Sequence, residues 1–111
     1  MTEDRGHFYR VAERGEDIVG FIHFSTKEDG NKRLEGLYVA KSALGTGLAQ
    51  RLISEASSWL GNADIELEVI SYNDRAKAFY RKQGFVELPG ENELFKGKLP
   101  NITMIRKGGT L

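Results

Sequence analysis

The sequence has no cysteine and no excess of charge of either sign. Without cysteine, the chain cannot form a disulfide, use a thiolate nucleophile or bind a metal through cysteine. Lysine and arginine together number 16, as do aspartate and glutamate, so the formal net charge is zero. General nucleic-acid binders and polybasic membrane-surface proteins usually carry a basic excess. We therefore expect no nucleic-acid partner and no membrane partner.

Long apolar runs are also absent. The longest, such as Ile18–Ile22, span a handful of residues, whereas a helix that crosses a bilayer needs roughly 20. Met1–Arg5 shows no apolar signal region, so we predict a cytoplasmic protein. A chain of 111 residues is long enough for one core, and no linker or repeat divides it, so residues 1–111 are predicted to form a single domain.

The first forty residues predict an antiparallel meander of three strands. Residues His7–Glu13 and Ile18–Ser25 are rich in aromatic and β-branched side chains, and Arg14–Asp17 lies between them as a turn. A second turn at Lys27–Asn31 leads to a third strand at Leu34–Ala40.

The apolar spacing then changes from two residues to four. This spacing predicts an amphipathic helix over Leu48–Leu60 that stops at Gly61. Alternating apolar residues at Asp64–Ser71 predict the next strand. A strand, a helix and a strand imply a right-handed crossover, so this strand is expected to run parallel to Leu34–Ala40.

A second helix is predicted that begins at Asn73 or Asp74, either of which can cap its start, and that ends at Gly84. Two further strands are predicted at Phe85–Leu88 and Ile102–Ile105, with a polar, irregular segment at Asn92–Pro100 between them. The predicted order of elements is therefore βββαβαββ.

The segment Gly45-Thr46-Gly47 joins the third strand directly to the first helix. The first N–H groups of a helix lack partners and carry the positive end of its dipole. Glycines let a ligand approach such a backbone closely, which favours a phosphate or pyrophosphate site. A tight turn alone would explain the same glycines. The segment has neither the nucleoside-triphosphate loop nor the third glycine of a dinucleotide fingerprint.

Residues Asn73–Phe85 resemble the N-x-x-A-x-x-F-Y-x-x-x-G-F signature of the GNAT superfamily of N-acetyltransferases. Leu44–Ala49 is similar to the acetyl-CoA pyrophosphate loop of that family, R/Q-x-x-G-x-G/A, with Leu44 in place of arginine or glutamine. The resemblance covers residues 7–107 and implies an α+β fold. Its mixed, mostly antiparallel sheet would have a central pair of splayed parallel strands. The resemblance also implies that this chain lacks the strand and two helices that usually precede the meander.

The resemblance implies that acetyl-CoA binds in the gap between the parallel strands. The pantetheine arm is expected to follow the third strand, and the pyrophosphate to meet N–H groups of the glycine loop. Asn73 is similar to the asparagine that contacts the pantetheine region, although a helix N-cap is an equally good interpretation. The residues expected to bind the cofactor are Leu37, Tyr38, Val39, Leu44, Gly45, Thr46, Gly47, Leu48, Ala49, Asn73 and Phe79.

Two residues are candidates for catalysis. Tyr80 resembles the general acid of the family, since a phenol with a pKa of about 10 can protonate a departing thiolate; packing beside Phe79 is the alternative. Family members often place a basic carboxylate on the strand before the loop, where this chain has Arg33. Glu35 lies two residues on and is the candidate general base, with an ion pair to a basic neighbour as the alternative.

Other ionisable residues have no predicted catalytic role. Glu66 and Glu68 share one strand face, where they could attract a cationic amine or simply face solvent. His7 and His23 are expected to be structural or surface residues, and no metal site is predicted.

Together these features predict an N-acetyltransferase that moves an acetyl group from acetyl-CoA to a primary amine. The amine, on a small molecule or a peptide, would attack the thioester directly in a ternary complex. A homodimer could cover the exposed part of the sheet. The alternative is a non-catalytic acyl-CoA-binding or interaction module with a degenerate acceptor site.

Overall fold

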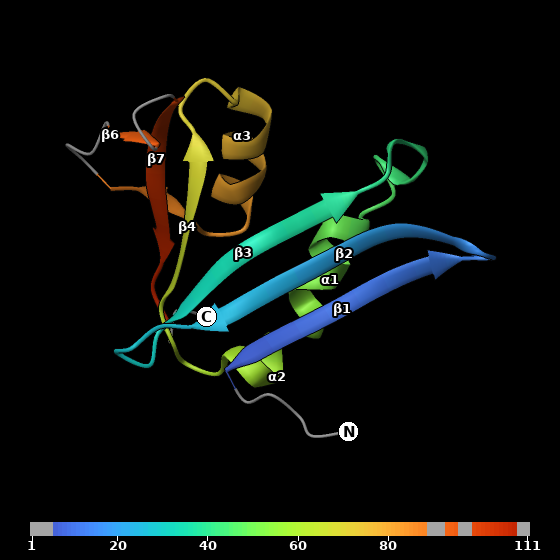
Figure 1. The fold of residues 1–111 in the computed structure, drawn as a ribbon, viewed down its shortest axis with the longest axis horizontal. Coiled ribbons are helices and arrows are strands. Elements are labelled where there is room, and N and C mark those ends of the chain that lie inside the picture. Colours follow the sequence, from blue (N-terminus) through green and yellow to red (C-terminus); the bar gives the residue numbers. More distant parts are fainter. Residues whose placement is uncertain (1–5, 89–92, 96–98, 109–111) are drawn as a thin grey trace.

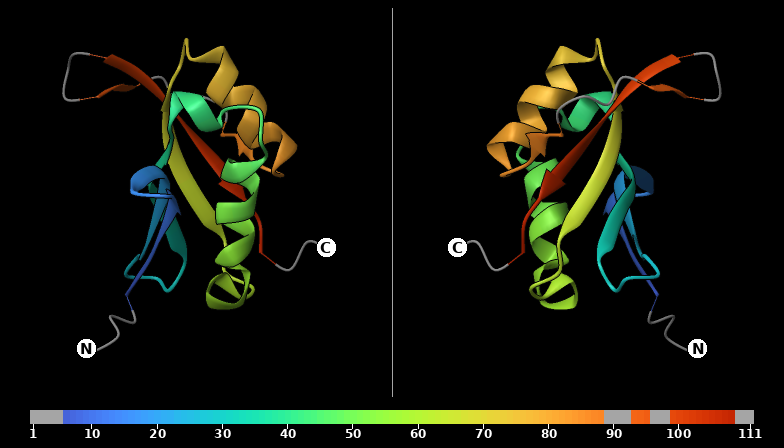
Figure 2. Two further views of the ribbon diagram at one scale, coloured as in Figure 1. Left: turned by 90° about the vertical axis from the view of Figure 1, so that its right-hand side faces the viewer. Right: turned by 90° about the vertical axis from the view of Figure 1, so that its left-hand side faces the viewer.

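The computed structural model describes residues 6–88, 93–95 and 99–108, which form one mixed sheet with its helices on one face (Figures 1 and 2). The elements are, in chain order, β1 (His7–Arg14), β2 (Asp17–Thr26), β3 (Lys32–Val39), η1 (Lys41–Ala43), α1 (Leu48–Glu55), α2 (Ser57–Leu60), β4 (Ile65–Ile70), α3 (Asp74–Lys82), β5 (Val86–Glu87), β6 (Glu93–Phe95) and β7 (Leu99–Arg106). The strand order is β1-β2-β3-β4-β7-β5, and β6 pairs with β7. Among these strands only β3 and β4 pair in parallel. The predicted α+β class is confirmed.

The predicted meander of three strands is confirmed. Arg14 pairs with Asp17 across the tip of the first hairpin, and Gly15 takes the positive φ of 63° that this two-residue turn requires. The third strand begins at Lys32, two residues before its predicted start, because the turn at residues 27–31 closes with a hydrogen bond from the Lys27 N–H to the Asn31 carbonyl.

The prediction of one continuous first helix was wrong. The chain forms α1 and then the short α2, with a break at the fully buried Ala56. At this residue the backbone has φ −86° and ψ −3°, which tightens the turn. The break allows Trp59 to pack its ring against Phe8 and Phe24, at centroid distances of 5.8 and 6.2 Å. Packing with distant aromatic residues therefore overrides the local helical periodicity.

The prediction of an irregular segment at Asn92–Pro100 was also wrong for the residues that the structure describes. Residues 93–95 form β6, which pairs with the start of β7 from Glu93 opposite Asn101 to Phe95 opposite Leu99. Asn92 and residues 96–98 lie outside the described ranges. Cross-strand backbone bonds do not depend on apolar side chains, so the polar composition was a poor guide. The strands predicted at Phe85–Leu88 and Ile102–Ile105 correspond to β5 and β7.

The core lies between the sheet and the helices. Both views in Figure 2 show α1 and α3 on the same side of the sheet. The alternating apolar residues of the central strands point to this side and meet the apolar faces of the helices. Among described residues, no helix is long and apolar enough to span a bilayer. The core residues are Phe8, Ile22, Phe24, Leu34, Leu52, Ile53, Ala56, Leu60, Ile65, Leu67, Val69, Phe85 and Met104.

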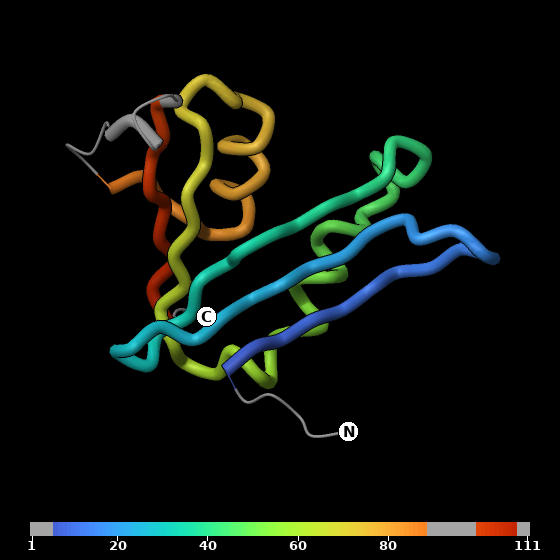
Figure 3. The backbone as a smooth tube through the Cα atoms, in the orientation of Figure 1, coloured from blue at the N-terminus to red at the C-terminus, as the bar shows by residue number. Residues whose placement is uncertain are grey.

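The parallel strands β3 and β4 form a fork. They pair only at Lys32 with Ile65 and at Arg33 with Glu66, and beyond these residues they diverge (Figure 3). The pairing of β3 with β2 shifts at this point, since Leu34 and Gly36 have partners and Glu35 between them has none. Such a bulge bends and twists its strand. The bulge therefore turns β3 away from β4 and opens the fork.

Candidate functional site

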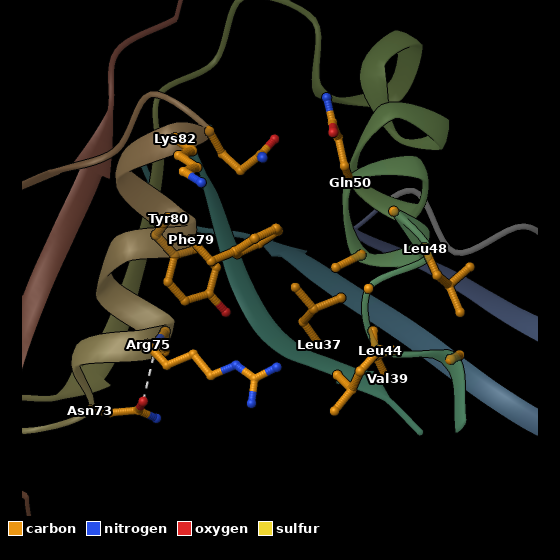
Figure 4. Close-up of a pocket in the computed structure, with 16 residues that line it drawn as sticks. Leu37, Val39, Leu44, Leu48, Gln50, Asn73, Arg75, Phe79, Tyr80 and Lys82 are labelled. Carbon is orange, nitrogen blue, oxygen red and sulfur yellow. Dashed lines mark hydrogen bonds between the residues drawn. The ribbon is translucent and has the colours of Figure 1, made fainter. Parts of the chain in front are cut away.

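The fork leads into a cavity of about 560 Å³ on the helix side of the sheet. Its floor is the second half of β3, and its walls are the start of α1 and one side of α3 (Figure 4). The divergence of the strands thus leaves an open groove between α1 and α3. The lining residues are Leu37, Val39, Ala43, Leu44, Gly45, Gly47, Leu48, Ala49, Gln50, Asn73, Arg75, Ala76, Phe79, Tyr80, Lys82 and Gln83.

The glycine loop presents bare backbone to this cavity. Gly45 and Gly47 have φ values of 79° and 81°, which glycine adopts readily and other residues do not. A Cβ at either glycine would have no atom within 4 Å, so the space in front of the loop is open. Within the described part of the chain, several N–H groups here have no acceptor, namely those of Gly45, Gly47, Leu48, Ala49 and Gln50.

These N–H groups suit an anion. The last three belong to the first turn of α1, where helix geometry leaves donors without partners and the helix dipole is positive. No side chain caps this helix, because its N-cap residue is Gly47. An anionic group placed in the cavity would therefore meet several oriented backbone donors at once.

Gly20 sets the position of this helix, a role that no sequence motif indicated. A Cβ on Gly20 would lie 3.0 Å from Leu48 Cδ2 and 3.0 Å from the Tyr38 carbonyl oxygen. The bare backbone of β2 thus lets Leu48, the first residue of α1, pack directly on the sheet. The mouth of the cavity depends on this close contact.

The start of α3 forms the opposite wall. The Asn73 side chain accepts a hydrogen bond of 3.1 Å from the Ala76 N–H and so caps α3. Asn73 also lines the cavity, so the cap and a ligand contact are compatible. The predicted end of the helix is likewise observed, since Gly84 follows the C-cap residue with φ 95°.

Tyr80 lies in the middle of this wall. Its ring packs at its edges against Phe79 and Phe85, with centroids 5.4 and 5.7 Å away, while its hydroxyl points into the groove (Figure 4). Burial raises the pKa of the Tyr80 phenol above its ordinary value of 10.0. The hydroxyl is therefore a protonated donor throughout the neutral pH range.

The far side of the fork carries a charged cluster centred on Arg33. Its guanidinium donates hydrogen bonds of 3.0 Å to Glu66 and 3.0 Å to Glu68 on β4, and its Nε lies 3.6 Å from Glu35. Glu35 also accepts a hydrogen bond of 2.5 Å from the Ser25 hydroxyl. Arg33 thus ties the two strands together where their backbone pairing ends.

The structure brings most of the predicted site residues together, but three of them do not line the cavity. Glu35 belongs to the Arg33 cluster, the Tyr38 side chain is half exposed, and the Thr46 hydroxyl donates to the Ala43 carbonyl instead. The predicted residues that line the cavity are Leu37, Val39, Leu44, Gly45, Gly47, Leu48, Ala49, Asn73, Phe79 and Tyr80.

Several lining residues were missed by the sequence analysis. On α3 the period of the helix would have found them, because residues three, four and seven positions apart share a face with Phe79. Gln50 follows Ala49 in the first turn of α1. The missed residues are Ala43, Gln50, Arg75, Ala76, Lys82 and Gln83.

A metal site does not emerge from the described ranges, which contain no group of three or more His, Asp or Glu side chains arranged to hold an ion. His7 and His23 form a cross-strand pair instead, with His7 Nδ1 2.9 Å from His23 Nε2. The pair lies on the meander, and neither histidine lines the cavity.

Comparison with known proteins identifies the family of this chain. The model of a family described as the acetyltransferase (GNAT) family matches residues 1–85. No curated protein matches the sequence. A crystal structure of a protein assigned as a streptothricin acetyltransferase from Bacillus anthracis, in complex with acetyl coenzyme A, is similar in fold, with a TM-score of 0.79 and 25% identity. The match covers 92% of this chain and 62% of that protein.

Two other solved structures share the fold at lower identity. Nourseothricin acetyltransferase has a TM-score of 0.79 and 22% identity, over 93% of this chain and 66% of that one. The ribosomal-protein-S18-alanine N-acetyltransferase from Escherichia coli has a TM-score of 0.78 and 21% identity, over 98% of this chain and 74% of the enzyme. The chain thus spans slightly less than two thirds of the length of the first two proteins.

Proposed function

Because the chain belongs to the acetyltransferase (GNAT) family, we propose that it transfers an acetyl group from acetyl-CoA to a primary amine. The observation that carries this proposal is the cavity at the fork. One groove combines unpaired N–H groups at the start of α1 with a protonated phenol, Tyr80, on the facing helix. Acetyl-CoA supplies an activated acetyl thioester and carries a pyrophosphate.

The residues present fit this donor. The N–H groups of Gly45, Gly47 and the first turn of α1 would hold the pyrophosphate. Beyond Arg33, the edge of β3 that faces β4 makes no strand pair among the described residues. Backbone groups near Leu37 and Val39 can therefore pair with the amides of the pantetheine arm, as an added strand does.

Tyr80 is proposed as the general acid. When the amine attacks, a carbon–nitrogen bond forms, the carbon–sulfur bond breaks, and the sulfur leaves with the electron pair. The Tyr80 hydroxyl points into the groove and is protonated at neutral pH, so it can give its proton to that sulfur. Its ring contacts with Phe79 and Phe85 hold the phenol in place.

Glu35 is proposed as the general base, on the other side of the fork. An alkyl ammonium has a pKa of about 10 and must lose a proton before it can attack. Glu35 stands on the bulge of β3, and its carboxylate is held by Ser25 and Arg33. A Glu35→Gln variant should lose activity mainly at low pH, because a larger share of the amine is already neutral at high pH. An identical loss at every pH would instead indicate a structural role for Glu35.

A second candidate function is a non-catalytic acyl-CoA-binding module. The observation in its favour is that Arg33 already engages Glu35, Glu66 and Glu68, which leaves less negative charge for an incoming ammonium. In this case the donor would bind, but no acetyl group would be transferred.

The two functions differ in one measurement. Purified protein is titrated with acetyl-CoA by calorimetry and then incubated with acetyl-CoA and a pool of small amines and peptides. A transferase releases free thiol only when amines are present, whereas a binding module shows binding heat without thiol release. Absence of binding would refute both. Dividing the active pool then identifies the acceptor.

A further inference from the structure

Two cationic side chains that line the cavity have no partner among the residues that the structure describes. Arg75 and Lys82 belong to α3, and within the described residues neither makes an ion pair or a hydrogen bond. The two other cations of this helix lie outside the cavity lining and are paired, Lys77 with Asp74 and Arg81 with Glu87. The helix thus leaves its charges uncompensated only on the side that faces the groove.

The two unpaired cations occupy different parts of the groove. They are seven residues apart, so they lie on the same side of α3 but roughly 10 Å from each other along its axis. Figure 4 shows the Arg75 side chain reaching from the start of α3 across the groove towards Val39 and Leu44. Lys82 lies at the far end of the helix. Arg75 is therefore the cation that faces the glycine loop.

The glycine loop itself has no cationic side chain, since residues 44–49 read Leu-Gly-Thr-Gly-Leu-Ala. Its N–H groups and the helix dipole provide the equivalent of about half a positive charge. A bound pyrophosphate would carry about two negative charges. A guanidinium adds a full positive charge and can donate two parallel hydrogen bonds to phosphate oxygens. The loop is thus complementary to the pyrophosphate in shape but short of positive charge.

We propose that Arg75 completes the pyrophosphate site from the facing helix and gives the chain its preference for coenzyme A thioesters over phosphate-free pantetheine thioesters. This inference rests on the proposed function, because it takes acetyl-CoA as the ligand of the groove. The pyrophosphate would lie between the backbone donors of α1 and the guanidinium of α3.

The test compares Arg75→Gln with Arg81→Gln by calorimetry, using coenzyme A and pantetheine as probes. Both variants lose one positive charge from the same helix, and Arg81 lies outside the cavity lining. Arg75→Gln should weaken coenzyme A binding about tenfold at low salt, as expected for a lost charge-assisted hydrogen bond. Arg81→Gln should change coenzyme A binding by less than about twofold, because Arg81 lies outside the cavity lining and its charge is already offset by Glu87. Pantetheine should bind all proteins equally.

Two further measurements sharpen the result. Arg75→Lys should retain part of the affinity, since it keeps the charge but loses the paired donors. Raising the salt to about 0.5 M should narrow the gap between wild type and Arg75→Gln, because exposed charges are screened. Arg75 is exposed and makes no contact that folding needs, so thermal unfolding of the variant should match that of the wild type.

Equal affinity of Arg75→Gln and Arg81→Gln for coenzyme A would overturn the inference, as would a larger loss in Lys82→Gln than in Arg75→Gln. These outcomes leave the proposed function intact. Conversely, an Arg75-dependent affinity without amine-dependent thiol release would support the inference and refute the transferase. A wild-type protein that does not bind coenzyme A would overturn both.

Discussion

Removing the hydroxyl of Tyr80 tests the proposed chemistry most directly. In Tyr80→Phe, the ring keeps its contacts with Phe79 and Phe85, at 5.4 and 5.7 Å between centroids. Among the described residues, the lost hydroxyl has no hydrogen-bond partner. The free energy of unfolding should therefore change by no more than about 0.5 kcal/mol near neutral pH. The substitution thus separates chemistry from folding.

The loss of activity should be large by comparison. A positioned general acid contributes roughly a hundredfold to ten-thousandfold to the rate, and a hundredfold loss corresponds to about 2.7 kcal/mol of transition-state stabilisation. Donor binding relies on the backbone of the glycine loop and should stay within about twofold of the wild type. We therefore expect turnover to fall by at least about a hundredfold while the dissociation constant of acetyl-CoA is kept.

The pH dependence gives a second readout. Because burial raises the pKa of Tyr80 above 10.0, the phenol keeps its proton at pH 7–9, and wild-type turnover should not decline on the alkaline side until above pH 10. Because burial disfavours the charged phenolate, the tyrosine ionises more easily in the unfolded state, so the free energy of unfolding should fall as the pH rises from 10.0 through the raised pKa of the folded state. Tyr80→Phe should lack that alkaline loss of stability.

The assay is thiol release with the amine identified from the pool, together with acetyl-CoA calorimetry and urea unfolding at each pH. Wild-type turnover by Tyr80→Phe would refute the general-acid role. A drop in turnover accompanied by an equal loss of acetyl-CoA affinity would show that the hydroxyl acts in binding and not in proton transfer.

Three further predictions concern the scaffold. In Gly47→Ala the new Cβ would have no atom within 4 Å, but the alanine would have to adopt the positive φ of 81°. Urea unfolding should therefore show a free energy of unfolding lower by roughly 1–2 kcal/mol, and calorimetry should show weaker acetyl-CoA binding. Gly20→Ala should cost about 1–3 kcal/mol by the same unfolding assay, because it overpacks the contact with α1; Gly36→Ala, whose new Cβ meets only the end of a ring at 3.3 Å, is the control and should cost less. The hydrogen bond from the Gly108 N–H lowers the pKa of Asp64 below 3.8, so Asp64→Asn should lower the midpoint of urea unfolding at pH 7. This difference from the wild type should vanish as the pH falls through the pKa of Asp64 in the folded state. A difference that stays constant with pH would show that the Asp64 charge does not contribute to stability.

Whether a feature could be predicted from the sequence depends on how far apart along the chain its interacting residues lie. The first hairpin, the cap at Asn73 and the stop at Gly84 were all predicted, because each depends on residues a few positions apart. The break at Ala56 was not predicted, because it depends on packing with distant aromatic rings. The pairing of β6 with β7 was not predicted either, because cross-strand backbone bonds leave no local pattern in the sequence.

The candidate site divides in the same way. The glycine loop was predicted, since a bare backbone at a helix start is readable from glycine spacing. The proposed contribution of Arg75 could not be predicted, because a charge without a partner is visible only once the ion pairs of Lys77 and Arg81 are known. Glu35 was placed on the correct strand, but its engagement by Ser25 and Arg33 depends on a register shift that no motif encodes.

By itself, the sequence determined the elements, their order and the residues that could take part in acetyl transfer, because helix period, strand alternation and positive φ are local properties of the backbone. The resemblance to the GNAT family implied that the parallel strands splay, but only the tertiary structure decided that β3 and β4 separate directly after Arg33 and which residues line the resulting cavity. The bulge at Glu35 turns β3 away from β4, while the ion pairs of Arg33 with Glu66 and Glu68, which join residues more than thirty positions apart, hold the two strands together where their backbone pairing ends. Interactions of that range form only when the sheet assembles, so no local pattern could predict them.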